Sequence, residues 1–274
     1  MKFPVIPAVL SILGMALVTL PAAPALAVTT CTFTDVGTTR TLVANCATDT
    51  TISVPDGFTL NGAGYTITAN DPAGDHFRGA VIKNGGPVAN VTNLKVTASG
   101  LANICDAGDD RLRGILFEGA SGSITNNQVF NVNQGPSGCQ EGNAIEVRNA
   151  PFDNTGATDK AVTISNNVVS GYIKNGITAN GSVAATITNN IVTGSGPVGV
   201  PLAAQNGIQI GFGGTATVEG NTISGNDYTP SSFVACGMLF FEADGVRQSR
   251  NMMSNNERNL CNFGRGGGQA HPAP

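Results

Sequence analysis

Short runs in which apolar and polar residues alternate recur along the chain after residue 50. One kind of run places Ile or Met directly after a small residue, and its five copies begin at Gly114, Ala144, Gly176, Gly207 and Gly237. Alternation over a few residues is typical of a β-strand with one buried face. Because no stretch after residue 28 has the spacing of a long amphipathic helix, the pattern predicts an all-β protein.

A second kind of run is rich in Thr and Ile, and its five copies end at Asn127, Asn167, Asn190, Asn221 and Asn251. From the first residue of each Gly-Ile run to the next of these asparagines there are 13 or 14 residues in four cases. The fifth case carries an insertion near residues 151–160. The return distance varies from 9 to 17 residues. Each repeat therefore has one short, constant side and one side with a variable loop.

Repeats of this length cannot each bury an apolar face, and stacking on neighbouring repeats solves that problem. Alternation then places Ile115, Ile145, Ile177, Ile208 and Met238 in one inward column, and Phe117, Val147, Ala179, Ile210 and Phe240 in the next. Asparagine suits the turns, because it tolerates left-handed backbone and can hydrogen-bond a stacked copy of itself. These features predict a single-stranded, right-handed parallel β-helix, which is a solenoid.

Two other all-β architectures compete with this interpretation. A β-propeller has a longer period, about 40–50 residues per blade. A sandwich needs hairpin turns, and Asn-Gly pairs do occur at residues 175–176 and 206–207. Both pairs stand at the head of a predicted strand, in register with residues 143–144, which argues against a hairpin role.

The repeats resemble a known superfamily. The segment Asn61–Ile67, the Ile-Thr-Asn-Asn runs and the segment Ala204–Ile210 are similar to the pectate-lyase-like parallel β-helix repeats, in particular to small secreted actinobacterial members. The resemblance covers roughly residues 50–262 and is specific for the fold. It implies one of several functions, because the superfamily includes polysaccharide lyases, glycoside hydrolases, uronate epimerases, phage tailspikes and non-catalytic surface proteins.

The first 27 residues have the pattern of a secretory signal peptide. Lys2 precedes an apolar run from Val5 to Leu20, and a small-residue segment ends at Ala27. The apolar run is shorter than the roughly 20 residues of a spanning helix. We therefore expect a secreted, extracellular protein with no membrane segment after cleavage, and a monomer. Residues 28–50 are predicted to form an N-terminal cap, residues 51–263 the β-helix, and residues 264–274 a disordered tail.

All six cysteines follow the signal segment, and an even number in an exported chain predicts three disulfides. Their positions at the predicted cap, in neighbouring variable loops and in the last coils predict the pairs Cys31–Cys46, Cys105–Cys139 and Cys236–Cys261. A metal or redox site is the alternative. It is disfavoured, because the chain has no Cys-x-x-Cys spacing and only two histidines. No metal or cofactor is expected.

The expected partner is a polysaccharide. The formal net charge of −4 argues against nucleic acid, whose binding depends on neutralising phosphates. In solenoids, loops gather on one face and form the binding surface. The side chains there that are expected to be catalytic are Asp110, Arg111, Glu141, Glu146 and Lys174, and those expected to bind substrate are Arg113, Arg148, Asn175, Gln205 and Gln209. Carboxylates can act as general acid and base, amides can orient hydroxyls, and the cations can neutralise a uronate or remove its C5 proton.

Structural roles compete with these assignments. Glu118 beside Arg148 fits a surface ion pair, and residues 109–113 fit a solvated loop with local pairs. His76 is expected far from the variable loops, where a role as general base is the alternative to none. Residues 108–110 are similar to the paired aspartates of polygalacturonase-type hydrolases, but the later motifs of that family are absent. The sequence thus leaves open an enzyme acting on a polysaccharide and a non-catalytic surface or matrix-binding protein.

Overall fold

The computed structural model describes residues 29–98, 100–150, 152, 159–229 and 233–264. The expected signal peptide (residues 1–27) and all but the first residue of the expected tail (residues 264–274) lie outside the described residues. The described residues form strands β1 to β25 and one turn of 3-10 helix, η1 (Gly108–Asp110). Within these ranges no helix is long and apolar enough to cross a membrane.

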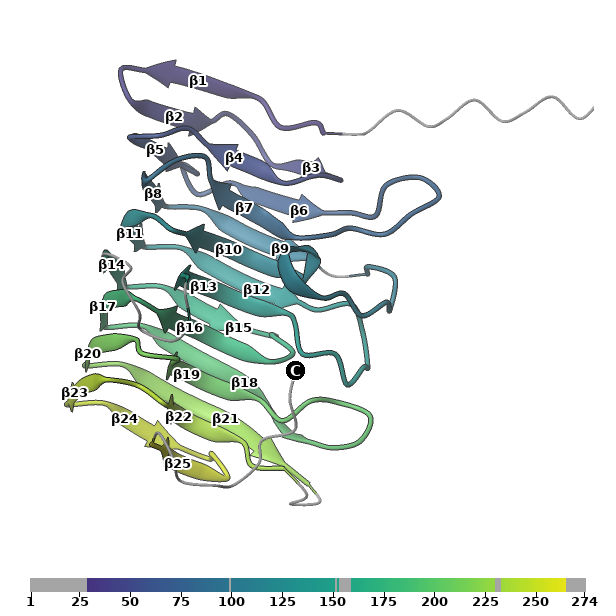
Figure 1. Ribbon diagram of the computed structural model, residues 1–274. Helices are drawn as coiled ribbons and strands as arrows, with labels where there is room; N and C mark the ends of the chain where they lie inside the picture. The colour runs from purple at the N-terminus through teal and green to yellow at the C-terminus, as the bar shows by residue number, and fades with distance from the viewer. Residues whose placement is uncertain (1–28, 99, 151, 153–158, 230–232, 265–274) are drawn as a thin grey trace, which may run out of the picture.

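The strands form three sheets, stacked along one axis as successive coils (Figure 1). Sheet A contains β1 (Phe33–Val36), β2 (Thr39–Leu42), β5 (Phe58–Asn61), β8 (Val88–Thr92), β11 (Ser121–Thr125), β14 (Lys160–Ser165), β17 (Val183–Thr188), β20 (Thr215–Glu219) and β23 (Gly245–Ser249). Sheet B contains β3 (Cys46–Thr48), β6 (Thr66–Ala69), β9 (Lys95–Ala98), β12 (Gln128–Val132), β15 (Val168–Ser170), β18 (Ile191–Val198), β21 (Thr222–Tyr228) and β24 (Met252–Ser254). Sheet C contains β4 (Ile52–Val54), β7 (Ala80–Asn84), β10 (Arg113–Glu118), β13 (Asn143–Asn149), β16 (Asn175–Gly181), β19 (Asn206–Gly211), β22 (Cys236–Phe241) and β25 (Arg258–Phe263).

The predicted right-handed parallel β-helix is confirmed. Each coil contributes one strand to every sheet, and the strand pairings are parallel except that of β1 with β2. Both predicted inward columns are in register: Ile115 pairs with Ile145, then Ile177, Ile208 and Met238. These side chains are fully buried, so the core is a set of apolar ladders that run the length of the solenoid.

Close packing explains the glycine of the Gly-Ile runs. A Cβ added at Gly176 would lie 2.4 Å from the side chain of Val192, and one at Gly207 would lie 2.4 Å from that of Ile223. At these positions sheet C therefore approaches the inward residues of sheet B more closely than a side chain allows.

A buried asparagine ladder lines the corner between sheets A and B. The Asn127 Nδ2 atom donates to Asn167 Oδ1 at 3.1 Å, and Asn167 Nδ2 donates to Asn190 Oδ1 at 3.0 Å. The ladder continues through Asn221 to Asn251. Because each amide also caps backbone groups, this corner is narrow and nearly constant from coil to coil.

The long connections leave the ends of the sheet B strands and lead to sheet C on one side of the stack (Figure 1). All three predicted disulfides are present. Cys31–Cys46 holds the β1–β2 hairpin at the first coil, Cys105–Cys139 joins two long connections, and Cys236–Cys261 joins β22 to β25. The parallel ladder begins at β2 and β3, inside the segment predicted as a cap.

Candidate functional site

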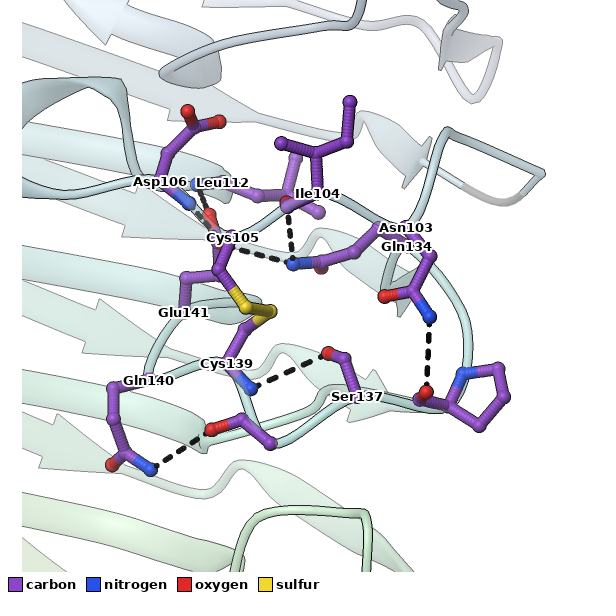
Figure 2. Close-up of a disulfide and its surroundings, with 12 residues drawn as sticks. Asn103, Ile104, Cys105, Asp106, Leu112, Gln134, Ser137, Cys139, Gln140 and Glu141 are labelled. Carbon is purple, nitrogen blue, oxygen red and sulfur yellow. Dashed lines mark hydrogen bonds between the residues drawn. A yellow bond between two sulfur atoms is a disulfide. The ribbon is translucent and has the colours of Figure 1, made fainter.

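The connections before β10 and β13 are fastened together around Glu141 (Figure 2). One carboxylate oxygen accepts from the Asp106 backbone N–H at 2.9 Å and from Gln134 Nε2 at 2.8 Å. The other accepts from the Leu112 N–H at 2.6 Å. Glu141 is 1% exposed. Three donors on a buried carboxylate make it a structural link between the two connections, and its oxygens face two backbone N–H groups and one side-chain amide rather than a ligand.

The Cys105–Cys139 disulfide lies beside this carboxylate. The two sulfur atoms and a Glu141 oxygen lie within 4.8 Å of one another, which is close enough for a shared metal ion. Both sulfurs are bonded to each other, however, so neither is a thiolate that could act as a ligand. The disulfide and Glu141 therefore link the two connections, and they do not offer the thiolate ligands of a metal centre.

The expected distance of His76 from the variable loops is wrong. Its Nε2 atom lies 2.9 Å from Asp106 Oδ2, and its Nδ1 atom lies 3.1 Å from Asp75 Oδ1. Arg78 bonds the same Asp75 carboxylate through two nitrogens. The connections before β7 and β10 therefore contact each other, and the imidazole is buried between two carboxylates at that contact.

Arg113 and Glu146 form a buried ion pair on neighbouring strands of sheet C. The Arg113 Nε atom donates to Glu146 Oε2 at 2.6 Å, and Asn143 Nδ2 donates to the same oxygen at 2.8 Å. The other guanidinium nitrogens donate to the carbonyls of Gly108 and Arg111. All three guanidinium nitrogens of Arg113 are therefore bonded, one to Glu146 on the neighbouring strand and two to the segment that contains η1. Glu146 Oε1 makes no hydrogen bond with the described residues and lies 4.0 Å from Arg148 Nη1.

Arg148 is the centre of a second charged group. Its Nη2 atom lies 2.6 Å from Glu118 Oε1 and 2.5 Å from Asp109 Oδ1, and Lys83 Nζ bonds the other Glu118 oxygen at 2.7 Å. The hydrogen bond from Arg148 lowers the pKa of the Asp109 carboxyl below its ordinary value. The predicted Glu118–Arg148 ion pair is confirmed. Since cations and carboxylates neutralise one another here, the first coils offer little free charge to a ligand.

The outward face becomes uncharged over β16 and β19. Gln209 Nε2 donates to Asn180 Oδ1 at 3.2 Å, and Asn206 Nδ2 donates to Asn175 Oδ1 at 3.0 Å. Thr178 is in register with Gln209. Its hydroxyl is buried and has no hydrogen-bond partner among the described residues. We call Asn175, Thr178, Asn180, Asn206 and Gln209 the neutral row. The amides of this row form hydrogen bonds with one another, whereas the Thr178 hydroxyl is left without a partner among the described residues.

Aromatic rings border the neutral row. The ring centroids of Phe212 and Phe241 are 5.2 Å apart, those of Phe241 and Phe263 are 6.5 Å apart, and those of Phe152 and Phe212 are 6.4 Å apart. Phe241 and Phe263 continue the column that holds Asn180 and Gly211. Sequence reasoning missed these rings, although the register that places Gly211 in the column also places Phe241 there.

Lys174 lies on the short connection before β16. Its Nζ atom donates to the Ala204 carbonyl at 3.3 Å. Burial lowers the pKa of the ammonium to about 8. The longer connections before β13 and β19 meet over this coil. Their closeness is shown at Gly138, where an added Cβ would lie 3.0 Å from the Pro201 carbonyl oxygen. An amine that is partly neutral near pH 8 can act as a base or a nucleophile.

The remaining predicted residues are separated. Asp110 is exposed in η1, and its carbonyl accepts from the Gly79 N–H. The Arg111 Nε atom is buried without a partner among the described residues. Gln205 anchors its own loop, because it donates to the Tyr172 carbonyl and accepts from the Ser195 N–H. The structure thus brings Glu146 together with Arg113 and Arg148, while neither Glu141 nor Lys174 contacts Glu146 in the described part.

Comparisons with known proteins address the family. A family model described as a right handed beta helix region matches residues 113–268. A solved structure of the Dettilon tailspike protein is similar at 13% sequence identity and a TM-score of 0.28, covering 82% of this chain and 60% of the tailspike chain. The chain thus spans less than two thirds of that protein's length. A search of curated proteins gives no match.

Proposed function

The chain belongs to the right-handed β-helix family, and on that premise we propose that it binds a polysaccharide along the outer face of sheet C, over β13, β16 and β19. The observation that carries this proposal is the neutral row beside the aromatic rings. Side-chain amides and hydroxyls match the hydroxyl groups of sugars, and the C–H face of a sugar ring packs on an aromatic ring.

The buried Thr178 hydroxyl supports this placement. A buried polar atom without a partner is rare and costs about 1–3 kcal/mol. A sugar hydroxyl that displaces the neighbouring Gln209 side chain would supply the missing hydrogen bond. Because the charged groups over β7 to β13 are already paired, this face favours an uncharged or weakly charged chain over a polyuronate.

We propose that this binding takes place outside the cell, by a monomer. The three disulfides support the location, since such bonds persist in oxidising compartments. Export itself depends on the expected signal peptide in residues 1–27.

Binding is tested by isothermal titration with a panel of neutral oligosaccharides. We expect Gln209→Ala and Thr178→Val to raise the Kd of a bound oligosaccharide tenfold or more, which corresponds to about 1.4 kcal/mol. Thr217→Val is the matched control, because Thr217 is an exposed threonine on sheet A. Equal affinity in all variants would contradict binding at sheet C.

Catalysis is the second candidate function, and Lys174 is the observation that favours it. A partly neutral amine can remove the C5 proton of a uronate in a lyase or epimerase reaction. Glu146 Oε1 could serve as an acid or base in a hydrolase. Incubation with uronate and neutral glycans would detect unsaturated products, epimerised residues or new reducing ends. Activity that is unchanged in both Lys174→Met and Glu146→Gln would show that neither residue is catalytic.

A further inference from the structure

A second surface lies at the corner between sheets A and B. A groove of about 690 Å³ runs along this corner, lined by Asn61, Ala63, Gly64, Asn93, Leu94, Lys95, Asn126, Asn127, Gln128, Asn166 and Val168. No lining residue belongs to sheet C or to its long connections. The groove is therefore separate from the surface proposed above.

Three asparagines repeat in this groove with one geometry. Asn93, Asn126 and Asn166 lie on successive coils at φ angles of 52°, 59° and 57°. Each is exposed and is followed by a buried residue. Because the backbone conformation is the same, the side chains leave the corner in the same direction, about 4.8 Å apart along the axis.

The amides of these asparagines are free to bond a ligand. None of the three side chains makes a hydrogen bond to the described residues. The next residue behaves differently: Asn127 and Asn167 each spend their side-chain amides inside the buried ladder. In each Asn-Asn pair, the side chain of the second asparagine thus hydrogen-bonds within the buried ladder, and that of the first faces outward.

The left-handed backbone does not by itself require asparagine at this position. Ala63, Gly220 and Arg250 adopt positive φ angles at the equivalent place on other coils. Asparagine occupies the place on four successive coils, from Asn93 to Asn189, and the groove follows the first three of them. Asparagine tolerates this turn and, in addition, presents an unbonded amide to the groove on these three coils.

The second column of the groove limits the ligand's charge. Lys95, Gln128 and Val168 are in register at the start of β9, β12 and β15. Lys95 is the only charged residue in the lining, and no carboxylate is present there. A surface of amides with one cation and one exposed valine fits hydroxyl groups better than it fits phosphates or carboxylates.

We propose that this corner groove is a second carbohydrate site, which takes an uncharged, extended glycan lying along the solenoid axis. The coil rise of about 4.8 Å is close to the length of one sugar ring in an extended β-linked chain. Successive asparagines can then bond successive sugars, through different hydroxyls on neighbouring sugars, because each residue of a β-1,4-linked chain is turned over relative to the one before it. With sheet C, the protein holds two glycan chains on different sides.

The test uses the full chain, labelled with ¹⁵N at asparagine, and the probes cellohexaose and chitohexaose. We expect the side-chain amide signals of Asn93, Asn126 and Asn166 to shift on titration with at least one probe. The triple variant Asn93→Gly, Asn126→Gly, Asn166→Gly keeps the turns, because glycine accepts positive φ. We expect it to raise the Kd at the corner tenfold or more.

Asn189→Gly is the matched control, since it makes the same change one coil beyond the groove, and we expect it to leave binding unchanged. Absent shifts with both probes would overturn the proposal, as would an equal loss in Asn189→Gly or tighter binding of trigalacturonate than of either probe. Shifts confined to Asn175, Asn180 and Asn206 would overturn the corner site and keep sheet C. Shifts confined to Asn93, Asn126 and Asn166 would support the corner site and overturn binding at sheet C.

Discussion

The ammonium group of Lys174 is largely buried from water. Among the described residues its ammonium group has one hydrogen-bond partner, the Ala204 carbonyl oxygen, and no carboxylate there offsets the cost of burying the charge. Glu141 shows the opposite case, a buried carboxylate with three donors. Among the predicted catalytic residues, Lys174 is thus the one whose environment favours its uncharged form.

This environment predicts a pH dependence of stability. The folded pKa of Lys174 is about 8, below the ordinary 10.5. The unfolded chain therefore binds more protons between these values, and the free energy of unfolding should rise with pH from 8 toward 10.5. The gain is at most about 3 kcal/mol. Below pH 8 Lys174 is protonated in both the folded and the unfolded chain, so the full cost of burying its charge remains.

Urea denaturation at pH 7.5 and 9.5 measures this change. Lys174→Met is the reference, and its unfolding free energy should lack the rise. Measurements should stop short of pH 10, because burial raises the pKa of Tyr172 and ionisation of that tyrosine then favours the unfolded chain. A rise of the same size in wild type and variant would rule out Lys174 as its source.

At the scale of elements, the corner between sheets A and B depends on the asparagine ladder. Asn167 accepts from the Asn127 backbone and side chain, and it donates to the Ile124 carbonyl and to Asn190. It is fully buried. The Asn167 side chain thus satisfies the Ile124 carbonyl of β11 and the Asn127 N–H in the turn between β11 and β12.

We expect Asn167→Ala to lower the free energy of unfolding by about 3 kcal/mol or more, because it leaves buried backbone groups unpaired. Chemical denaturation measures the loss. Asn166→Gly changes the exposed neighbour, whose positive φ glycine tolerates, and should cost well under 1 kcal/mol. If the two variants lost similar stability, the ladder would not be what holds this corner.

The repeating elements could be predicted from the sequence, and the connections could not. The columns of Ile115 and Phe117 follow from alternation, because every coil repeats the same constraint. The disulfide pairs follow from their places in that frame. His76 was placed wrongly, since the path of an aperiodic loop depends on its own side-chain contacts. Glu141 has a candidate's chemistry in the sequence, and only the three donors around it show its structural role.

At the scale of the whole molecule, the solenoid is stabilised coil by coil. Each coil contacts only its neighbours, so stability spreads through nearest-neighbour contacts rather than through one central core. The first coil differs from the others, because β1 pairs antiparallel with β2 and Cys31–Cys46 fastens this hairpin to β3. Removal of that disulfide should therefore act mainly at one end.

We expect Cys31→Ala with Cys46→Ala to speed amide hydrogen exchange in β1, β2 and β3 and to leave exchange in β13 to β19 unchanged. The disulfide closes a 15-residue loop, which is worth about 3 kcal/mol in the chain-entropy model. Cys105→Ala with Cys139→Ala is the comparison, and it should speed exchange in the connections before β10 and β13. Faster exchange in every coil of the first variant would show that the solenoid unfolds as one cooperative unit instead.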